Sequence, residues 1–352
     1  MVAHLEASGT PHYIGFQHGS TFADEVRACR DFYCRFPATP PQMVDEAIDH
    51  LQAIHSRHFP AMVQEMRGIA DGSGLPYRDV LALNFFAQIV GEAGSCSNIG
   101  VSDSPQGPIV AKTSDLREVE RDFLFIKRAR PDDGLAYIQY TFYGTVWNEG
   151  GFNASGLSIV NSGLMGQATL RREGVAGFAL QHAALSRCTT VDETVKLYSE
   201  HDLAKWGGTI LVADAAGGLV LIEKLPGSQA LRQPLRESHA GLLIHTNHVV
   251  CFENGTLQGD ADLESKYGYS GLLQNSLARY ATLERIAPET GHSLSGLQEA
   301  LRNHSPSGPI CQHGQQGLHS AAGIVIVPRT RTMWGTAGYP CQTPFEPYTL
   351  AD

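Results

Sequence analysis

The periodicity of the apolar residues changes near residue 95, and this change limits the folds that the chain can adopt. Up to residue 90 most apolar positions recur every three or four residues, which predicts amphipathic helices. From Cys96 onward, short runs such as CSNIGV and PIVAKTSD alternate with turn-forming residues, which is typical of β-hairpins. Strands grouped around paired helices therefore predict an α+β protein with packed antiparallel sheets.

The strands after Cys96 alternate only loosely between apolar and polar residues, so we expect both faces of each sheet to be covered. Two sheets packed on each other, with helices outside both, satisfy this requirement. Helical patterns within the strand-rich part favour the same arrangement; they span residues 177–188, 190–202, 273–288 and 293–304. The 352 residues contain no internal repeat or obvious linker, and they fit one large domain or two ordinary ones.

Composition excludes several classes of protein. An apolar content of 42% with 18% charged residues is typical of a globular protein with a large core. A net charge of −10 argues against a nucleic-acid surface, which needs a basic patch. No segment approaches the roughly 20 apolar residues that span a bilayer, and the start lacks a signal-peptide pattern. The seven cysteines are odd in number and lack metal-type spacing, so we expect reduced thiols, no bound metal and a cytoplasmic location.

Cys96 follows small, turn-prone residues and opens the first predicted hairpin, so the peptide bond before it is expected to be strained and accessible. Lys112 and Asp115, 16 and 19 residues later, should return alongside it on the second strand. A nearby cation favours a thiolate, and a carboxylate can orient the reacting groups. If the chain is cut before Cys96, the new α-amine, with a pKa of about 7.7–8, can take the thiol proton. The alternative is a cysteine that is simply buried as a small apolar residue.

The segment LLIHTNHVV (residues 242–250) predicts a strand whose alternation places His245 and Asn247 on one face. A metal site formed by His245, His248 and Cys251 conflicts with that alternation. The amide of Asn247 can donate a hydrogen bond to a developing oxyanion. Alternatively, it ends the strand with a local backbone bond.

Together, these segments resemble the acyl-coenzyme A:6-aminopenicillanate acyltransferase family. Its members are self-processing N-terminal-nucleophile (Ntn) enzymes of penicillin biosynthesis and their bacterial relatives. The resemblance runs nearly from end to end, and the order and spacing of its segments make it specific. The segments are GTPHYIGFQHGS (9–20), EMRGIADGSG to DVLALN (65–84), the hairpin of Cys96 and Asp115, GFNASGLSIVNSGL (151–164), HTNH (245–248) and SPSGPIC (305–311).

The resemblance implies a four-layer αββα Ntn-hydrolase fold and a precursor that is cut immediately before Cys96. Residues 1–95 would form a mostly helical first chain and residues 96–352 the catalytic chain, associated in one compact domain. Cys96 would be the nucleophile and its amine the general base. Asp115 would position both groups, and Asn247 would supply an oxyanion donor.

The sequence departs from the pattern at three places. Bile salt hydrolases and penicillin V acylases have an arginine three positions before the aspartate, whereas Lys112 keeps the charge without the planar fork. Ser95 stands where the penicillin enzyme has glycine before the nucleophile. Gln312 and His313 follow IC where that enzyme has arginine, so a substrate-binding cation is expected to be missing and penicillin need not be the substrate. Lys112, Gln312 and His245 are therefore treated as supporting residues.

The predicted function is that of an autoproteolytically activated cysteine amidohydrolase or acyltransferase. It would act on a small amide or thioester through an acyl-cysteine intermediate, with water or an amine as the acceptor. No cofactor, nucleic acid or membrane partner is expected, and the sequence leaves the oligomeric state open. The alternative from another class is an unprocessed, catalytically inactive binding or scaffold protein of the same fold.

Overall fold

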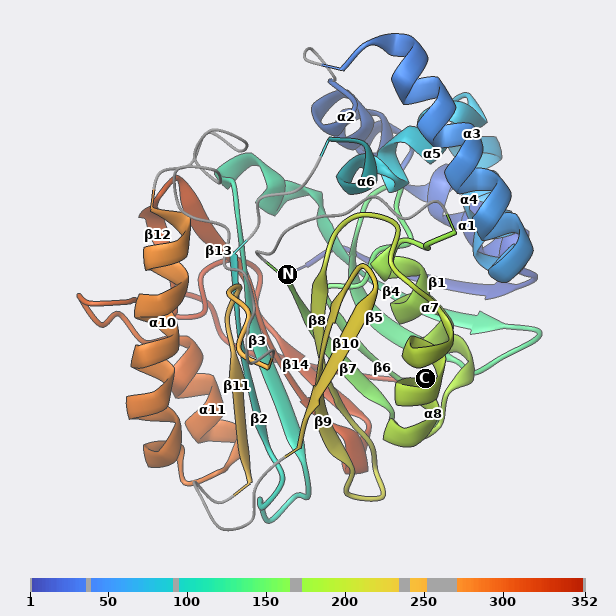
Figure 1. Cartoon of the computed structure of the whole chain (residues 1–352). Coiled ribbons are helices and arrows are strands. Elements are labelled where there is room, and N and C mark those ends of the chain that lie inside the picture. Colours follow the sequence, from blue (N-terminus) through green and yellow to red (C-terminus); the bar gives the residue numbers. More distant parts are fainter. Residues whose placement is uncertain are drawn as a thin grey trace.

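Two β-sheets lie face to face, and helices cover the outer face of each sheet (Figure 1). The computed structural model describes residues 2–35, 39–90, 95–164, 173–233, 241–251 and 271–350. Within these ranges the layers follow the order helices, sheet, sheet, helices. The predicted four-layer αββα arrangement is thereby confirmed.

The larger sheet has eight strands in the described residues, in the order β1-β4-β5-β6-β7-β8-β9-β10. Neighbouring strands are antiparallel except β1 and β4, which run parallel. The strands are β1 (His4–Gly9), β4 (Leu124–Pro131), β5 (Tyr137–Phe142), β6 (Gly150–Asn153), β7 (Ser158–Gly163), β8 (Gly208–Ala213), β9 (Leu219–Leu225) and β10 (Ser228–Arg232).

The second sheet carries the cysteine hairpin and is ordered β11-β2-β3-β13-β14-β15, with β12 paired to β13. Its strands are β2 (Ser95–Val101), β3 (Ile109–Leu116), β11 (Leu242–His245), β12 (His313–Gln315), β13 (Leu318–Val327), β14 (Thr332–Gly335) and β15 (Glu346–Thr349). The hairpin β2–β3 confirms the prediction that Cys96 opens one. β12 and β15 were not predicted, because each is too short to show a periodic pattern.

The two outer helical layers come from different parts of the chain. The helices over the larger sheet are α1 (Pro11–Thr21), α2 (Ala23–Tyr33), α3 (Pro41–His58), α4 (Pro60–Ser73), α5 (Tyr77–Asn84), α6 (Phe86–Val90), α7 (Gly177–Arg187) and α8 (Val191–Glu200). The second sheet is covered by α10 (Leu272–Ile286) and α11 (Leu294–Leu301). Proline shapes the first group: instead of kinking one long helix, Pro60 begins a new helix after α3 ends at His58. No helix of the described ranges has the length and apolar character needed to cross a bilayer.

Glycines explain why two of the family-like segments near the N-terminus fold against each other. A Cβ atom on Gly15 of α1 would lie 1.9 Å from the carbonyl oxygen of Glu65 in α4. A Cβ atom on Gly68 of α4 would lie 1.8 Å from the carbonyl oxygen of His12. The two helix backbones are therefore in direct contact, and only glycine permits this approach.

The hairpin β2–β3 is buried along its whole length, because helices cover one face and the larger sheet covers the other. Ile99 and Val101 pack with α10 and α11 in an apolar cluster. Gly100, between them, faces the other way, since a Cβ atom there would lie 2.9 Å from Leu211 of β8. Alternate residues of each hairpin strand therefore point toward the helices α10 and α11, which we call the helix face, or toward the larger sheet, which we call the inter-sheet face.

Candidate active site

Cys96 lies at the start of β2, directly opposite Ser114 of β3. Two residues further along, Asn98 is opposite Lys112. Because these residues alternate in phase with Gly100, their side chains lie on the face that contacts the larger sheet. Asn98 confirms this direction, since its amide donates to Ser162 Oγ of β7 at 3.1 Å. The thiol therefore lies between the two sheets.

The polar neighbours of the thiol form a buried charged network. Lys112 is fully buried, and its Nζ lies 2.8 Å from Glu149 Oε2 and 2.6 Å from Asn161 Oδ1. Ser114 Oγ donates to the same Glu149 oxygen at 2.6 Å. Burial alone would lower the pKa of Lys112, but its interactions with Cys96 and with the Glu149 carboxylate outweigh that effect and raise it. The cation predicted beside Cys96 is therefore present and charged.

In the uncut chain the Lys112 ammonium does favour the thiolate form of Cys96, but burial of the thiol opposes it. Burial raises the pKa of the Cys96 thiol to about 11, and the Lys112 ammonium opposes the rise only in part. Glu149 also neutralises part of the lysine charge. The thiol consequently needs a base to react near neutral pH.

The backbone nitrogen of Cys96 has a side-chain partner. Cys96 N–H donates to Asn247 Oδ1 at 3.0 Å, and Asn247 Nδ2 donates to the carbonyl oxygen of Gly163 at 2.9 Å. The nitrogen that would become an α-amine after cleavage is therefore already held by a side-chain oxygen. One of the two Asn247 amide hydrogens is used by Gly163, which leaves one for another acceptor.

Asp115 lies opposite Ser95, on the helix face of the hairpin and not on the face of the thiol. Its carboxylate accepts hydrogen bonds from Ser320 Oγ at 2.5 Å, Gln312 Nε2 at 2.9 Å and Thr113 Oγ1 at 3.2 Å. Burial raises the pKa of Asp115, against the opposing effects of a nearby guanidinium and these hydrogen bonds. Asp115 is thus placed to order the residue before Cys96 rather than to touch the sulfur.

Arg279 of α10 is a site residue that the sequence analysis missed. It is fully buried and donates to Cys96 O at 2.6 Å, Ser97 Oγ at 2.8 Å, Asn247 Oδ1 at 2.8 Å and Asn275 Oδ1 at 2.8 Å. The sequence carries little signal of it, because the buried face of α10 is polar around Arg279, with Asn275, Ser276 and Thr282 beside it. A charged residue at such a position needs buried partners.

Gln312 and Asn275 complete a polar shell around Ser95. Gln312 Nε2 lies 3.3 Å from Ser95 Oγ, and Ser95 Oγ lies 3.4 Å from Asn275 Oδ1 and 3.5 Å from Asn247 Oδ1. Asn275 Nδ2 donates to Gln312 Oε1 at 2.8 Å. The cation expected to be missing at position 312 is indeed replaced by an amide, yet the guanidinium of Arg279 lies within the same network.

His245 lies on β11 opposite Asn98 of β2, and its imidazole has partners other than the thiol. Its Nε2 is 2.8 Å from Glu223 Oε1 in β9, and its Nδ1 is 3.2 Å from Ser162 Oγ. Asn98 also donates to Ser162, so a shared hydroxyl links the imidazole to the side chain of Asn98. The predicted alternation after β11 is confirmed, because the next residue, Thr246, instead contacts Ser276 of α10.

The expectation of an accessible bond before Cys96 is wrong. Ser95 is fully buried and Cys96 is 7% exposed, because both belong to a regularly paired strand that is covered on both faces. The turn-prone residues 91–94 lie outside the described residues. A protease from outside could not reach this bond, whereas an intramolecular attack needs no such access.

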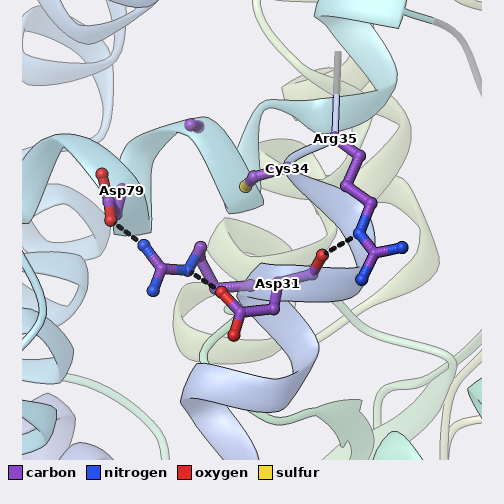
Figure 2. A pocket seen from close by; sticks show the side chains of 6 residues that line it. Asp31, Cys34, Arg35 and Asp79 are labelled. Atoms are coloured by element: carbon purple, nitrogen blue, oxygen red, sulfur yellow. Dashed lines mark hydrogen bonds and ion pairs between the residues drawn. The ribbon is translucent and has the colours of Figure 1, made fainter. Parts of the chain in front are cut away.

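One pocket of about 500 Å³ lies elsewhere, over α2 and α5 (Figure 2). Arg30 forms ion pairs with Asp31 and Asp79, and Arg35 donates to the carbonyl oxygen of Asp31. The charged side chains of Arg30, Asp31 and Asp79 in this pocket are thus paired with one another. The pocket shares no residue with the Cys96 site.

Comparison with known proteins gives the following similarities. The family model of acyl-coenzyme A:6-aminopenicillanic acid acyl-transferase matches residues 102–340. The acyl-coenzyme A:6-aminopenicillanic-acid-acyltransferase 40 kDa form of Emericella nidulans is 22% identical over 286 residues, 79% of this chain and 78% of that protein.

Two solved structures are also similar. The Caenorhabditis elegans N-acylethanolamine-hydrolyzing acid amidase ortholog has 14% identity and a TM-score of 0.48, covering 66% of this chain and 93% of that chain. Penicillin V acylase from Agrobacterium tumefaciens has 16% identity and a TM-score of 0.45, covering 69% of this chain and 83% of that chain.

Proposed function

Because this chain belongs to the acyl-coenzyme A:6-aminopenicillanic acid acyl-transferase family, we propose that it is an Ntn amidohydrolase or acyltransferase that activates itself by cleavage before Cys96. The family match begins at residue 102, so the proposal for Cys96 rests on the site itself. One observation carries it. Side chains from three separate segments converge on Ser95 and Cys96: Asn247 on the nitrogen of Cys96, Gln312 on the hydroxyl of Ser95 and Arg279 on the carbonyl oxygen of Cys96.

In the proposed cleavage, the Cys96 sulfur attacks the carbonyl carbon of Ser95. A carbon–sulfur bond forms, the carbon–nitrogen bond breaks, and the thiol proton goes to the departing amine. Water then hydrolyses the thioester, which leaves a carboxylate on Ser95 and a free thiol and amine on Cys96. Asp115 and Gln312 would hold Ser95 during this rearrangement.

The products would be chains of 95 and 257 residues (352 − 95), the proposed helical and catalytic chains. They would stay associated, because β1 of the first chain pairs with β4 of the second in the larger sheet, and the helical layer shares its core with that sheet. All seven cysteines fall within the described residues and are unpaired, which supports the proposal of a reducing, cytoplasmic environment.

In the mature enzyme the new amine of Cys96 would be the general base. Its pKa of about 7.7–8 leaves much of it neutral near pH 8, so it can accept the thiol proton as the sulfur attacks a substrate carbonyl. Asn247 would hold the amine through Oδ1, and its second amide hydrogen would be available to the oxyanion. Lys112 would stabilise the negative charge on the sulfur.

The acyl-cysteine intermediate would pass its acyl group to water or to an amine. The name of the Emericella nidulans relative gives acyl-coenzyme A and 6-aminopenicillanic acid as the substrates of that acyltransferase. For this chain we propose a small amide or thioester as the donor. Comparing product release with and without an added amine distinguishes hydrolysis from transfer.

A second candidate is an unprocessed, catalytically inactive binding or scaffold protein of the same fold. Two observations favour it: the bond before Cys96 is buried in a regular strand, and the thiol has a pKa of about 11 in the uncut chain. Self-cleavage distinguishes the two candidates.

The test is the intact mass of the denatured protein, measured for the wild type, Cys96→Ala and Cys188→Ala. Cys188 is the matched control, because it is also 7% exposed and lies outside the site. We expect two chains that meet between Ser95 and Cys96 in the wild type and in the control, and one chain in Cys96→Ala. A wild-type chain that remains intact on prolonged incubation would exclude the amine base and favour the second candidate.

A further inference from the structure

Four metal-ligating side chains meet on the outer side of the second sheet: His304, Cys311, His313 and Cys341. One ligand atom from each lies within 4.8 Å of every other. The residues come from the segment after α11, the approach to β12, the first residue of β12, and the connection between β14 and β15. No spacing of a known metal motif joins them, which is why the sequence analysis expected no metal site.

Two of the six separations between ligand atoms are close to those around a tetrahedral ion, and all six lie within 4.8 Å. His313 Nε2 lies 3.5 Å from Cys311 Sγ and 3.3 Å from Cys341 Sγ. Zinc binds nitrogen at about 2.0–2.1 Å and sulfur at about 2.3 Å, so a tetrahedral angle places the two ligand atoms about 3.6 Å apart. The side chains therefore need to shift by only a few tenths of an ångström at these two edges.

The surroundings orient one ligand and leave the cluster open to a metal. The ring of His313 stacks on Tyr339, with centroids 3.9 Å apart and planes at 9°. Tyr339 is held in turn by His319 Nδ1, 2.6 Å from its hydroxyl. Cys311 is buried, whereas His304 and His313 are exposed, so an ion can enter from the solvent side.

We propose that these four residues bind one zinc ion in a structural Cys2His2 site. Four protein ligands would complete the coordination shell and leave no open position for a substrate, as in structural zinc sites. The ion would join three segments, which carry His304, then Cys311 with His313, and Cys341. These segments come together only in the folded chain. Gln312, between two of the ligands, donates to Asp115, so the metal would also steady one side of the Cys96 site.

The site does not depend on the chemistry proposed for Cys96, and it is tested without any activity assay. The reduced chain, purified without a histidine tag, is titrated anaerobically with Zn²⁺ against a chromophoric chelator. We expect about one tightly bound zinc ion per chain. Since loss of even an outer-shell partner typically costs about 10–100-fold in affinity, Cys341→Ser and His313→Gln should each weaken binding at least about 100-fold.

The matched control is Cys34→Ser, a half-buried cysteine outside the cluster, which should bind zinc like the wild type. With Co²⁺ as the probe, the thiolate-to-metal absorption should decrease in Cys341→Ser and remain in Cys34→Ser. Circular dichroism identifies variants that keep the fold. Three results would overturn the proposal: a wild-type chain that takes up no zinc, uptake unchanged in folded Cys341→Ser, or recovery of Cys311 and Cys341 joined in a disulfide from the freshly isolated chain.

Discussion

Replacing Arg279 by methionine tests whether a buried guanidinium holds the Cys96 site together. The substitution keeps an unbranched side chain but removes the charge and every donor. Of its four acceptors, Asn247 Oδ1 keeps the Cys96 N–H, and the Ser97 hydroxyl can rotate to another partner. The carbonyl oxygen of Cys96 and Asn275 Oδ1 lose their shortest hydrogen bonds within a buried site.

A buried acceptor that is left without a partner costs about 1–3 kcal/mol, and removal of one partner from a buried charged network typically costs about 3–5 kcal/mol. The loss of the guanidinium also removes the main charge that opposes the raised pKa of Asp115. We therefore expect the free energy of unfolding to fall by about 3–5 kcal/mol in Arg279→Met. A chain of ordinary stability would remain folded after this loss.

The assay is urea unfolding followed by circular dichroism, with every variant built on Cys96→Ala so that the chain stays in one piece. At a slope of about 3 kcal/mol per molar urea, the midpoint should fall by about 1 M or more. The control is Arg285→Met on the same helix. Arg285 is exposed, and among the described residues it donates only to Ser305 Oγ at 3.3 Å, so the midpoint of Arg285→Met should fall by about 0.3 M or less. Equal shifts in the two variants would refute the reasoning.

Three further predictions concern other parts of the chain. Burial holds the pKa of the Cys96 thiol at about 11, so the rate of precursor cleavage, followed by mass spectrometry, should rise about tenfold per pH unit between pH 7 and 9. Lys112→Met should lower this rate. A rate that does not change with pH would contradict the prediction. Burial lowers the pKa of His55 to about 4, so the neutral ring, which predominates above pH 6.5, is the form that the fold favours. The free energy of unfolding should therefore decrease by about 2–3 kcal/mol as the pH falls from 6.5 toward 4. His55→Gln should reduce that acid-dependent loss in urea unfolding, and an unchanged pH slope would rule the histidine out. Gly68→Ala should lower the free energy of unfolding by about 3 kcal/mol, because the new Cβ atom would overlap a backbone carbonyl of α1. Gly163 has open space around it, so Gly163→Ala should lower the free energy of unfolding far less in the same assay.

Local structure was largely predictable from the sequence, because it depends on neighbours within a few residues. Thr10 followed by proline is typical of a helix start, and the Thr10 hydroxyl accepts from the N–H of Tyr13 at the start of α1. Ser293 caps α11 in the same way. Gly74, in the glycine-rich segment ADGSG, ends α4 in a left-handed conformation. The hairpin at Cys96 has the predicted partner strand, and Asp115 is the penultimate residue of that strand.

The environment of the site was less predictable, since competing effects had to be weighed in three dimensions. Lys112 was correctly expected near the thiol, but the sequence could not show that burial would outweigh its charge. Asp115 was correctly expected on the return strand, yet register and alternation place it on the opposite face from the sulfur. Arg279 and Glu149 reach Cys96 only because a helix and the other sheet pack against the hairpin.

By itself, the sequence determined the layers of this protein: helices first, a hairpin opening at Cys96, and strands covered on both faces. Periodicity, caps and turns carry that information locally. Only the tertiary structure decided which side chains meet at Ser95 and Cys96, and which three side chains join His313 at the proposed zinc site. Those residues are separated by up to 217 positions at the first site and 37 at the second. Contacts over such separations depend on how whole layers pack, and no spacing along the chain specifies that.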